Sequence, residues 1–267
     1  MIIEWNAHMF SSDTERYPFH LRAAYVPGES SRSPDPLADY MKRMKVEGID
    51  RAVLVHPEPY GDDHRLALDC VARHPDLFRT TALFYPKDRD APQRLEKLLR
   101  EHRGTIVAHR FHAHEGKRSY FDSFADQNMH DMWVVAGEAG VVNELHIDSS
   151  YAAQAEQLVR RYPQYPVLID HLAEAKYGSA PQFADVINLA TYDNVYMKLS
   201  GINHFASDGP LYESAIPFTR WVADTFGQDR MVWGSGTPAI VDTHLGHWSE
   251  DARDRVKGGN LKGLLGF

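Results

Sequence analysis

Short apolar runs recur along the whole chain and are separated by longer amphipathic stretches. Residues 166–169, Pro-Val-Leu-Ile, show no alternation of polar and apolar positions, which is typical of a strand that is covered on both faces in a parallel sheet. Other runs have the same length and a similar composition. The predicted strands are residues 1–4, 51–55, 79–85, 104–111, 141–147, 166–169, 194–200 and 230–234.

The stretches between these runs have apolar residues at helical spacing. In residues 35–48, for example, Leu37, Tyr40 and Met44 fall on one stripe of a helix. The predicted helices are residues 35–48, 62–74, 91–102, 127–140, 151–162, 181–191, 211–226 and 250–265. Residues 11–35 show no sustained period, and we expect this long loop to cover the mouth of a site.

Strands and helices alternate without a break in composition, which predicts a single α/β domain over residues 1–267 with the architecture of a (β/α)₈ TIM barrel. An open, doubly wound sheet is the structural alternative. That fold usually has a glycine-rich phosphate loop after its first strand, and no such loop follows residues 1–4.

Composition narrows the class of protein. The formal net charge is −8 and there is no basic block, so we expect no nucleic-acid partner. The single cysteine, Cys70, excludes an internal disulfide and suits a reducing compartment. No apolar run is long enough to span a membrane, and the first residues lack the pattern of a signal peptide, so we expect a cytoplasmic protein.

Polar and reactive side chains gather where the predicted strands end. In a barrel, the carboxyl ends of the strands carry the catalytic residues. The residues at these positions are His8, His56, Arg110, His112, His146, Asp170, His171, Lys198 and Ser200. We expect His8, His146 and His171 to converge in one pocket. The pair His112 and His114 is predicted to lie in an exposed loop.

Five segments, in their order and spacing, resemble a known family. They are residues 56–61 (HPEPYG), 168–172 (LIDHL), 194–201 (NVYMKLSG), 226–235 (FGQDRMVWGS) and 258–260 (GGN). Together they are similar to the amidohydrolase-2 branch of the amidohydrolase superfamily, which includes lactonases that act on sugar lactones and on 2-pyrone-4,6-dicarboxylate. The resemblance implies a distorted (β/α)₈ barrel and a hydrolase that opens cyclic esters.

Two positions depart from that family pattern. The family usually has His-X-His after the first strand, and here the first position is Asn6. The family usually has Gly-Ser-Asp after the last strand, and here Gly236 stands in place of the aspartate, which in relatives is a metal ligand, a base for water, or both. The sequence leaves open whether Gly236 is natural or an engineered substitution.

These departures favour a site without an obligatory metal. Asparagine is a poor zinc ligand and glycine offers no ligand at all. The resemblance also implies this, since some lactonases of the family work without metal. Zinc held by His8, His146 and His171 is the alternative.

Without metal, the hydrolysis of an ester needs a base for water and a group that stabilises the oxyanion. Histidine has a suitable pKa, so we expect His8, His146 and His171 to be catalytic. Five further residues are predicted to bind a small, anionic or polyhydroxylated substrate. They are Asn6, Glu58, Tyr60, Arg110 and Lys198. Tyr25 and Arg22 are expected near the entrance.

Two other functions remain open at this point. A metal-dependent decarboxylase or hydrolase of the same family would need the aspartate that Gly236 replaces. A barrel that has lost catalysis would only bind a small anion. The sequence indicates neither the identity of the substrate nor the oligomeric state.

Overall fold

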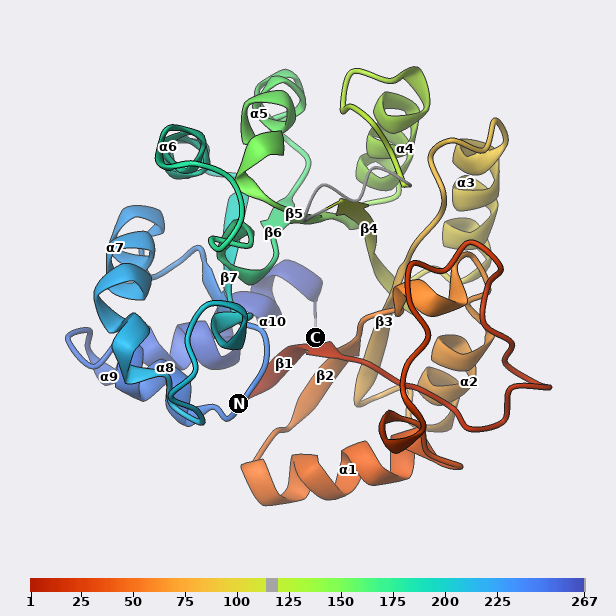
Figure 1. The fold of residues 1–267 in the computed structure, drawn as a ribbon, viewed down its shortest axis with the longest axis horizontal. Helices are drawn as coiled ribbons and strands as arrows, with labels where there is room; N and C mark the ends of the chain where they lie inside the picture. Colours follow the sequence, from red (N-terminus) through yellow and green to blue (C-terminus); the bar gives the residue numbers. More distant parts are fainter. Residues whose placement is uncertain (114–119, 267) are drawn as a thin grey trace.

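The computed structural model describes residues 1–113 and 120–266. Eight parallel strands follow one another in chain order and form a nearly closed ring (Figure 1). They are β1 (Ile3–Ala7), β2 (Arg51–Leu54), β3 (Phe78–Ala82), β4 (Ile106–Ala113), β5 (Val142–Ile147), β6 (Val167–Ile169), β7 (Val195–Leu199) and β8 (Met231–Trp233). The predicted (β/α)₈ barrel is confirmed, and most strand ends differ from the prediction by only one or two residues.

Helices surround the ring on the outside (Figure 1). They are α1 (Pro36–Glu47), α2 (Arg65–Arg73), α3 (Ala91–Glu101), α4 (Gln127–Glu138), α5 (Ala152–Arg161), α6 (Ala180–Asn188), α7 (Ile216–Phe226), α8 (Ala239–His244), α9 (Glu250–Asp254) and α10 (Asn260–Leu265). The helix predicted over 211–226 begins later, and the one predicted over 250–265 is interrupted. Among the described residues, no helix is long and apolar enough to cross a membrane.

Local sequence explains where the elements begin and end. The side chain of Asp35 accepts a hydrogen bond of 3.0 Å from the backbone N–H of Ala38, and Pro36 occupies the first turn of α1. Gly48 ends the helix with a φ of +69°, a conformation that glycine adopts without strain. The apolar stripe that predicted this helix, with Leu37 and Met44, is buried as expected.

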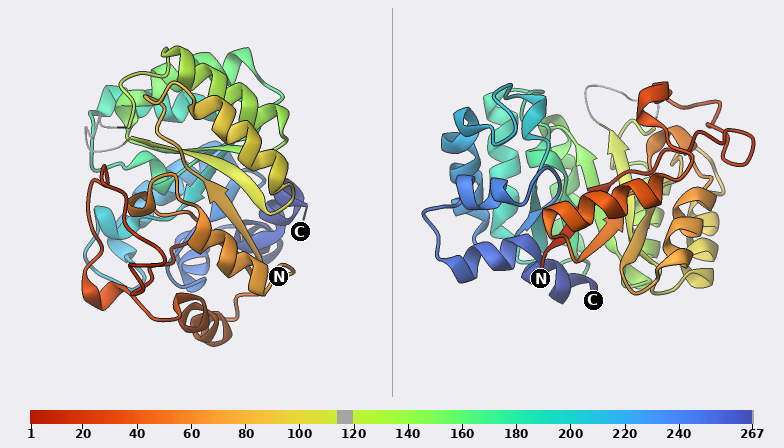
Figure 2. Two further views of the ribbon diagram at one scale, coloured as in Figure 1. Left: turned by 90° about the vertical axis from the view of Figure 1, so that its right-hand side faces the viewer. Right: turned by 90° about the horizontal axis from the view of Figure 1, so that it is seen from below.

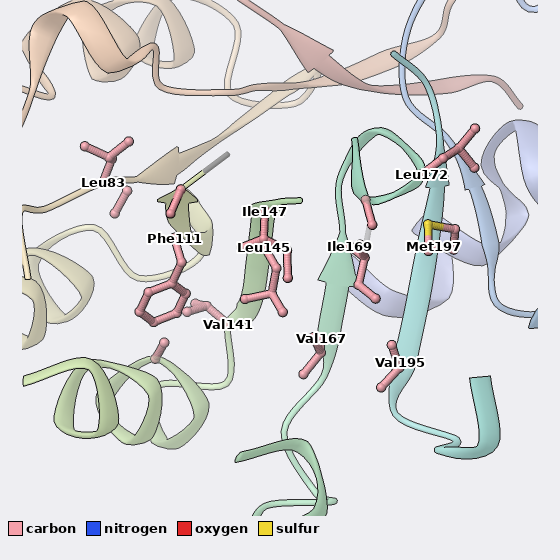
Figure 3. Close-up of a cluster of buried hydrophobic side chains, with 14 of the residues drawn as sticks. Leu83, Phe111, Val141, Leu145, Ile147, Val167, Ile169, Leu172, Val195 and Met197 are labelled. Carbon is pink, nitrogen blue, oxygen red and sulfur yellow. The ribbon is translucent and has the colours of Figure 1, made fainter. Parts of the chain in front are cut away.

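The core has two parts. The larger lies between the sheet and the helices, where Phe111, Leu145, Ile169 and Met197 extend outward from successive strands (Figure 3). The smaller fills the inside of the barrel and consists of Ile3, Trp5, Val53, Val55, Val107, Ala108, Val142, Leu168, Val232 and Leu261. Because Leu261 belongs to α10, that helix contributes to the filling of the barrel.

The strand order places all carboxyl ends at one end of the barrel. Figure 2 shows the long segment between β1 and α1 at that end, as predicted, and both chain termini toward the opposite end. A functional site is therefore expected under this segment.

Candidate active site

A cavity of about 600 Å³ opens at the carboxyl ends of the strands. It is lined by Asn6, His8, Tyr25, Glu58, Arg110, His112, His146, His171, Lys176, Tyr177, Gly201, Asn203, His204 and Ser235. Its walls are polar and carry several imidazoles. A cavity of this size at this edge of a barrel suits a small, polar ligand.

A bulge in β1 directs two side chains toward this cavity. Trp5 packs inside the barrel and Ala7 packs outside, because the pairing with β2 shifts register between them. Asn6 and His8, which are two residues apart, both line the cavity. The side-chain oxygen of Asn6 is buried, and no described residue forms a hydrogen bond with it.

The tautomer of His8 follows from its contact with the backbone. Its Nδ1 lies 2.9 Å from the carbonyl oxygen of Val55, which can only accept, so Nδ1 carries the proton and Nε2 carries the lone pair. Burial and the nearby charge of Arg110 lower the pKa of His8 to about 4. At neutral pH this imidazole is an uncharged proton acceptor.

A buried group of charged residues underlies the cavity. Arg110 donates two hydrogen bonds to Oδ2 of Asp170, at 3.0 and 2.7 Å. The ammonium of Lys198 lies 2.5 Å from Oδ1 of Asp170 and 2.6 Å from Oε1 of Glu144. Burial alone would raise the pKa of Asp170, but the charges of Lys198 and Arg110 keep it below its usual value. Burial and the negative charge of Asp170 raise the pKa of Glu144. Asp170 is thus a charged anchor for Arg110.

An unusual turn after β6 carries two more side chains of the site. Residues His171, Leu172, Ala173 and Glu174 all have positive φ, between 46° and 53°. The backbone N–H of Glu174 bonds to the carbonyl oxygen of His171 at 3.0 Å, so the segment is one left-handed turn of 3₁₀ type. In such a turn, side chains three residues apart lie above one another, which brings His171 and Glu174 to the same side.

Glu174 joins two imidazoles. Its Oε1 lies 2.8 Å from Nε2 of His146, and its Oε2 lies 2.9 Å from Nδ1 of His204. The other ring nitrogen of His146, Nδ1, lies 2.9 Å from Nη2 of Arg110. A guanidinium has no acceptor, so Nδ1 must accept from Arg110 and Nε2 must donate to Glu174. Both nitrogens of His146 are engaged.

His171 has one contact that indicates its tautomer. Its Nδ1 lies 2.8 Å from the hydroxyl oxygen of Ser200. In the described part of the chain, this nitrogen is the only hydrogen-bond partner of the Ser200 hydroxyl. The buried hydroxyl satisfies its proton only if it donates to Nδ1. Nε2 of His171 then carries the proton and can donate into the cavity. Gly201 makes this packing possible, because a Cβ there would lie 2.5 Å from Cβ of His171.

The structure brings most of the predicted site residues to the cavity. They are Asn6, His8, Glu58, Arg110, His146 and His171. Tyr60 and Lys198 lie behind its wall instead. The Tyr60 hydroxyl accepts a hydrogen bond of 2.9 Å from the backbone N–H of Ser11, and Lys198 is fully buried between its two carboxylates. Lys198 is separated from the cavity by its depth within the barrel, which alternation does not reveal. Tyr60 is separated from it because its ring packs in the larger core outside the barrel.

The prediction that His112 lies in an exposed loop was wrong. His112 is inside β4, is only 7% exposed, and lines the cavity beside His146, with ring centroids 4.6 Å apart. The strand is longer than predicted, which turns His112 inward together with Arg110. His114 lies outside the described residues. Tyr25 lines the cavity, whereas Arg22 pairs with Asp88 at 2.7 Å.

Several lining residues have no signal in the sequence. Among them, Lys176, Tyr177, Asn203, His204 and Ser235 were not predicted. Glu174, which bonds to His146 and His204 without lining the cavity itself, was not predicted either. All lie in loops after β6, β7 and β8, where neither helical nor strand periodicity applies. Their positions at the ends of successive strands are the only clue that could have identified them.

Comparison with known proteins assigns the chain to a family. The sequence pattern described as amidohydrolase matches residues 6–258. The chain belongs to the amidohydrolase family. The resemblance seen in the sequence is therefore confirmed, and so is the expectation of a hydrolase.

Two curated relatives match most of the chain. It is 28% identical to the 4-sulfomuconolactone hydrolase of Hydrogenophaga intermedia, over 98% of this chain and 80% of that protein. It is 29% identical to the L-fucono-1,5-lactonase of Burkholderia ambifaria, over 80% of this chain and 79% of that protein. Both relatives are named as enzymes of cyclic esters.

Solved structures support the fold. One is an Acinetobacter baumannii protein described as a probable 2-pyrone-4,6-dicarboxylic acid hydrolase, with citric acid bound. Its TM-score is 0.80 at 16% identity, and the match covers 100% of this chain and 99% of that one. Another is an amidohydrolase of Burkholderia multivorans with bound zinc, with a TM-score of 0.74 at 16% identity, covering 100% and 99% of the two chains.

The chain has side chains of the kind that bind zinc. One nitrogen or oxygen from each of His146, His171 and Glu174 lies within 4.8 Å of the others, and two imidazoles with one carboxylate form a known catalytic zinc set. This cluster differs from the predicted alternative, because Glu174 belongs to it and His8 does not. The hydrogen bonds of His146 do not fit a bound ion, however. A zinc-binding histidine normally donates its second N–H, whereas His146 accepts from Arg110 at that nitrogen.

Proposed function

We propose that this hydrolase is a lactonase, which opens a cyclic ester carrying an acidic or hydroxylated substituent, and that it needs no metal. The observation that carries the proposal is the pairing, in one cavity, of a fixed cation at Arg110 with neutral imidazoles at His8 and His171. The names of the curated relatives support the class of substrate. The partner is thus a small molecule.

His8 is the proposed base. The hydrogen bond from Nδ1 to the carbonyl oxygen of Val55 fixes the ring and leaves the lone pair on Nε2. As a water molecule attacks the lactone carbonyl, His8 takes a proton from it, and the carbonyl oxygen becomes an oxyanion. When the tetrahedral intermediate collapses, the ring carbon–oxygen bond breaks, and His8 returns the proton to the departing alkoxide. The product is the open hydroxy acid.

His171 and Arg110 are proposed to stabilise negative charge. The N–H at Nε2 of His171 suits the oxyanion, which it would meet only as the charge develops. Arg110 is held rigidly by Asp170 and suits a carboxylate or sulfonate on the substrate. The amide oxygen of Asn6 has no hydrogen-bond partner among the described residues, which suits a substrate hydroxyl or the attacking water.

His146 is not suited to act as the base, although the sequence predicted it to be catalytic together with His8 and His171. Both of its nitrogens are engaged, one with Arg110 and one with Glu174. We propose that it orients Arg110 and links that side chain to the turn after β6. Glu58, which is 3% exposed, accepts a hydrogen bond of 2.9 Å from the backbone N–H of Ala24 and holds the entrance segment in place.

An aspartate, the residue that the family usually has here, would not fit easily at position 236. The φ of Gly236 is +88°, and a Cβ there would lie 2.6 Å from Cδ1 of Ile240. We expect Gly236→Asp to lower stability by about 1–2 kcal/mol, from left-handed strain alone, without a large gain in rate. A large rate gain would show instead that the aspartate is the missing base and that the glycine replaced it.

The experiment is a panel of sugar lactones and pyrone carboxylates, followed by acid release, with enzyme dialysed against a chelator. We expect turnover of at least one class, and a loss of roughly 100-fold or more in His8→Gln. His247→Gln, at a surface imidazole that pairs with Asp224, is the matched control. Binding of lactones without turnover would indicate an inactive binding barrel, and release of carbon dioxide from hydroxybenzoates would favour a decarboxylase.

A further inference from the structure

We propose that Arg110 excludes metal ions from the cluster formed by His146, His171 and Glu174, and that its guanidinium replaces the positive charge an ion would supply there. This inference deepens the proposed metal-free function and assigns the reason for it to a single side chain.

The cluster itself is well formed for an ion. The left-handed turn after β6 places His171 and Glu174 on one side, and β5 brings His146 to meet them. All three residues are buried, and their candidate ligand atoms lie within 4.8 Å of one another. Neither the type of donor nor the spacing explains why an ion would be refused.

The protons on His146 provide the reason. Its Nε2 faces Glu174 and carries the proton, because its Nδ1 accepts from Arg110. An ion at Nε2 would require that proton to move to Nδ1 or to leave the ring. If the proton moved to Nδ1, it would point at an N–H of Arg110. If the proton left the ring, His146 would become an imidazolate. Binding an ion therefore requires the bond between Arg110 and His146 to break.

Arg110 is not free to move away. It is 3% exposed and donates two hydrogen bonds to Asp170, which is itself held by Lys198 at 2.5 Å. The guanidinium charge stands beside the cluster and repels a divalent cation. Glu174, which accepts from two imidazoles, supplies a nearby negative charge. The positive charge of Arg110 and the negative charge of Glu174 therefore compensate each other without an ion.

The test measures metal binding directly. Chelator-treated protein is titrated with Zn²⁺ by calorimetry and with Co²⁺ by visible absorption, which reports the ligand set. Arg110→Met removes both the charge and the donor, and we expect it to bind Zn²⁺ at least about 10–100-fold more tightly than the unaltered protein, the range that partners of metal-binding histidines control. Glu174→Gln added to Arg110→Met should abolish the gain.

Two further variants keep the proposal falsifiable. Arg110→Gln removes the charge but keeps an N–H, so a smaller gain is expected, and it serves if Arg110→Met does not fold. Lys176→Gln removes a cation from the cavity lining without altering the hydrogen bonds of His146 to Arg110 and Glu174, and its affinity for Zn²⁺ should increase little. Equal gains in Lys176→Gln and Arg110→Gln, no gain in either Arg110 variant, or tight zinc binding by unaltered protein at this cluster would each overturn the proposal.

The proposed function is judged separately. Turnover of a lactone by chelator-treated, unaltered protein supports metal-free lactonase activity whatever the variants bind. Conversely, a gain of metal affinity in Arg110→Met supports the role of Arg110 even if no lactone in the panel is a substrate.

Discussion

Replacing Ala173 by glycine should cost this protein far less stability than the same replacement at Ala155. Both alanines are fully buried. Ala173 lies in the left-handed turn after β6 with a φ of +53°, whereas Ala155 lies within the right-handed helix α5. The two substitutions remove the same methyl group, so their difference isolates the backbone conformation.

The expected magnitudes follow from four contributions, of which one is common to both sites. Each substitution loses about 0.8 kcal/mol of apolar burial. At Ala155, glycine costs about 1 kcal/mol more in helix propensity, for a total near 2 kcal/mol. At Ala173, glycine lowers stability by about 0.4–1 kcal/mol, because it increases the entropy of the unfolded chain. It also relieves about 1–2 kcal/mol of left-handed strain in the folded state. The net change at Ala173 is therefore close to zero.

Thermal unfolding followed by circular dichroism, with urea titration as a second measurement, distinguishes the two variants. We expect Ala155→Gly to lower Tm by roughly 4–8 °C and Ala173→Gly to change it by no more than about 2 °C. Lactone turnover should survive in Ala173→Gly if the turn keeps its shape. Equal losses of stability in the two variants would refute the view that this turn is left-handed and strained.

The remaining predictions concern protons and buried charge. Because the pKa of His8 is lowered to about 4, kcat/KM should fall only below that pH, and a limb near pH 6.5 would contradict the assignment. Lys198→Met should cost about 3–5 kcal/mol in urea unfolding, and adding Glu144→Gln should recover part of it; no recovery would argue against their pairing. His109→Leu should raise the free energy of unfolding by about 1–3 kcal/mol, because both ring nitrogens of His109 are buried without a partner among the described residues. The gain should be larger at pH 5 than at pH 8, since the unfolded imidazole gains a proton below about pH 6.5, whereas the folded one, with its pKa lowered to about 3, stays neutral. Equal gains at both pH values would contradict it.

Much of the fold follows from the sequence through periodicity alone. In β4, for example, Arg110 lines the cavity and His109 packs against Phe111 of the outer core, because successive side chains of a strand point to opposite faces. The order of strands and helices predicted a parallel sheet, since neighbouring parallel strands need a crossover, and the missing glycine-rich loop after the first strand favoured the barrel over an open sheet. The cavity lies at the carboxyl ends of the strands, where the sequence predicted the reactive side chains.

What the sequence did not reveal depends on distance along the chain and on depth. Glu174 reaches His146 only because four consecutive residues adopt a left-handed turn that no propensity predicts. Lys198 was predicted to bind the substrate, but it is buried between the carboxylates of Asp170 and Glu144 and does not line the cavity.

The sequence by itself therefore determined the barrel and several of the strand-end side chains that turn inward at its top, among them His8, Arg110 and His146. Only the tertiary structure decided which of them face the cavity and which neutralise one another beneath it. The physical reason is that facing is set by local backbone geometry, whereas the partner of a buried charge is set by whichever distant strand lies within hydrogen-bond distance. The proton positions on His146, and with them the case against a metal, exist only in that assembled arrangement.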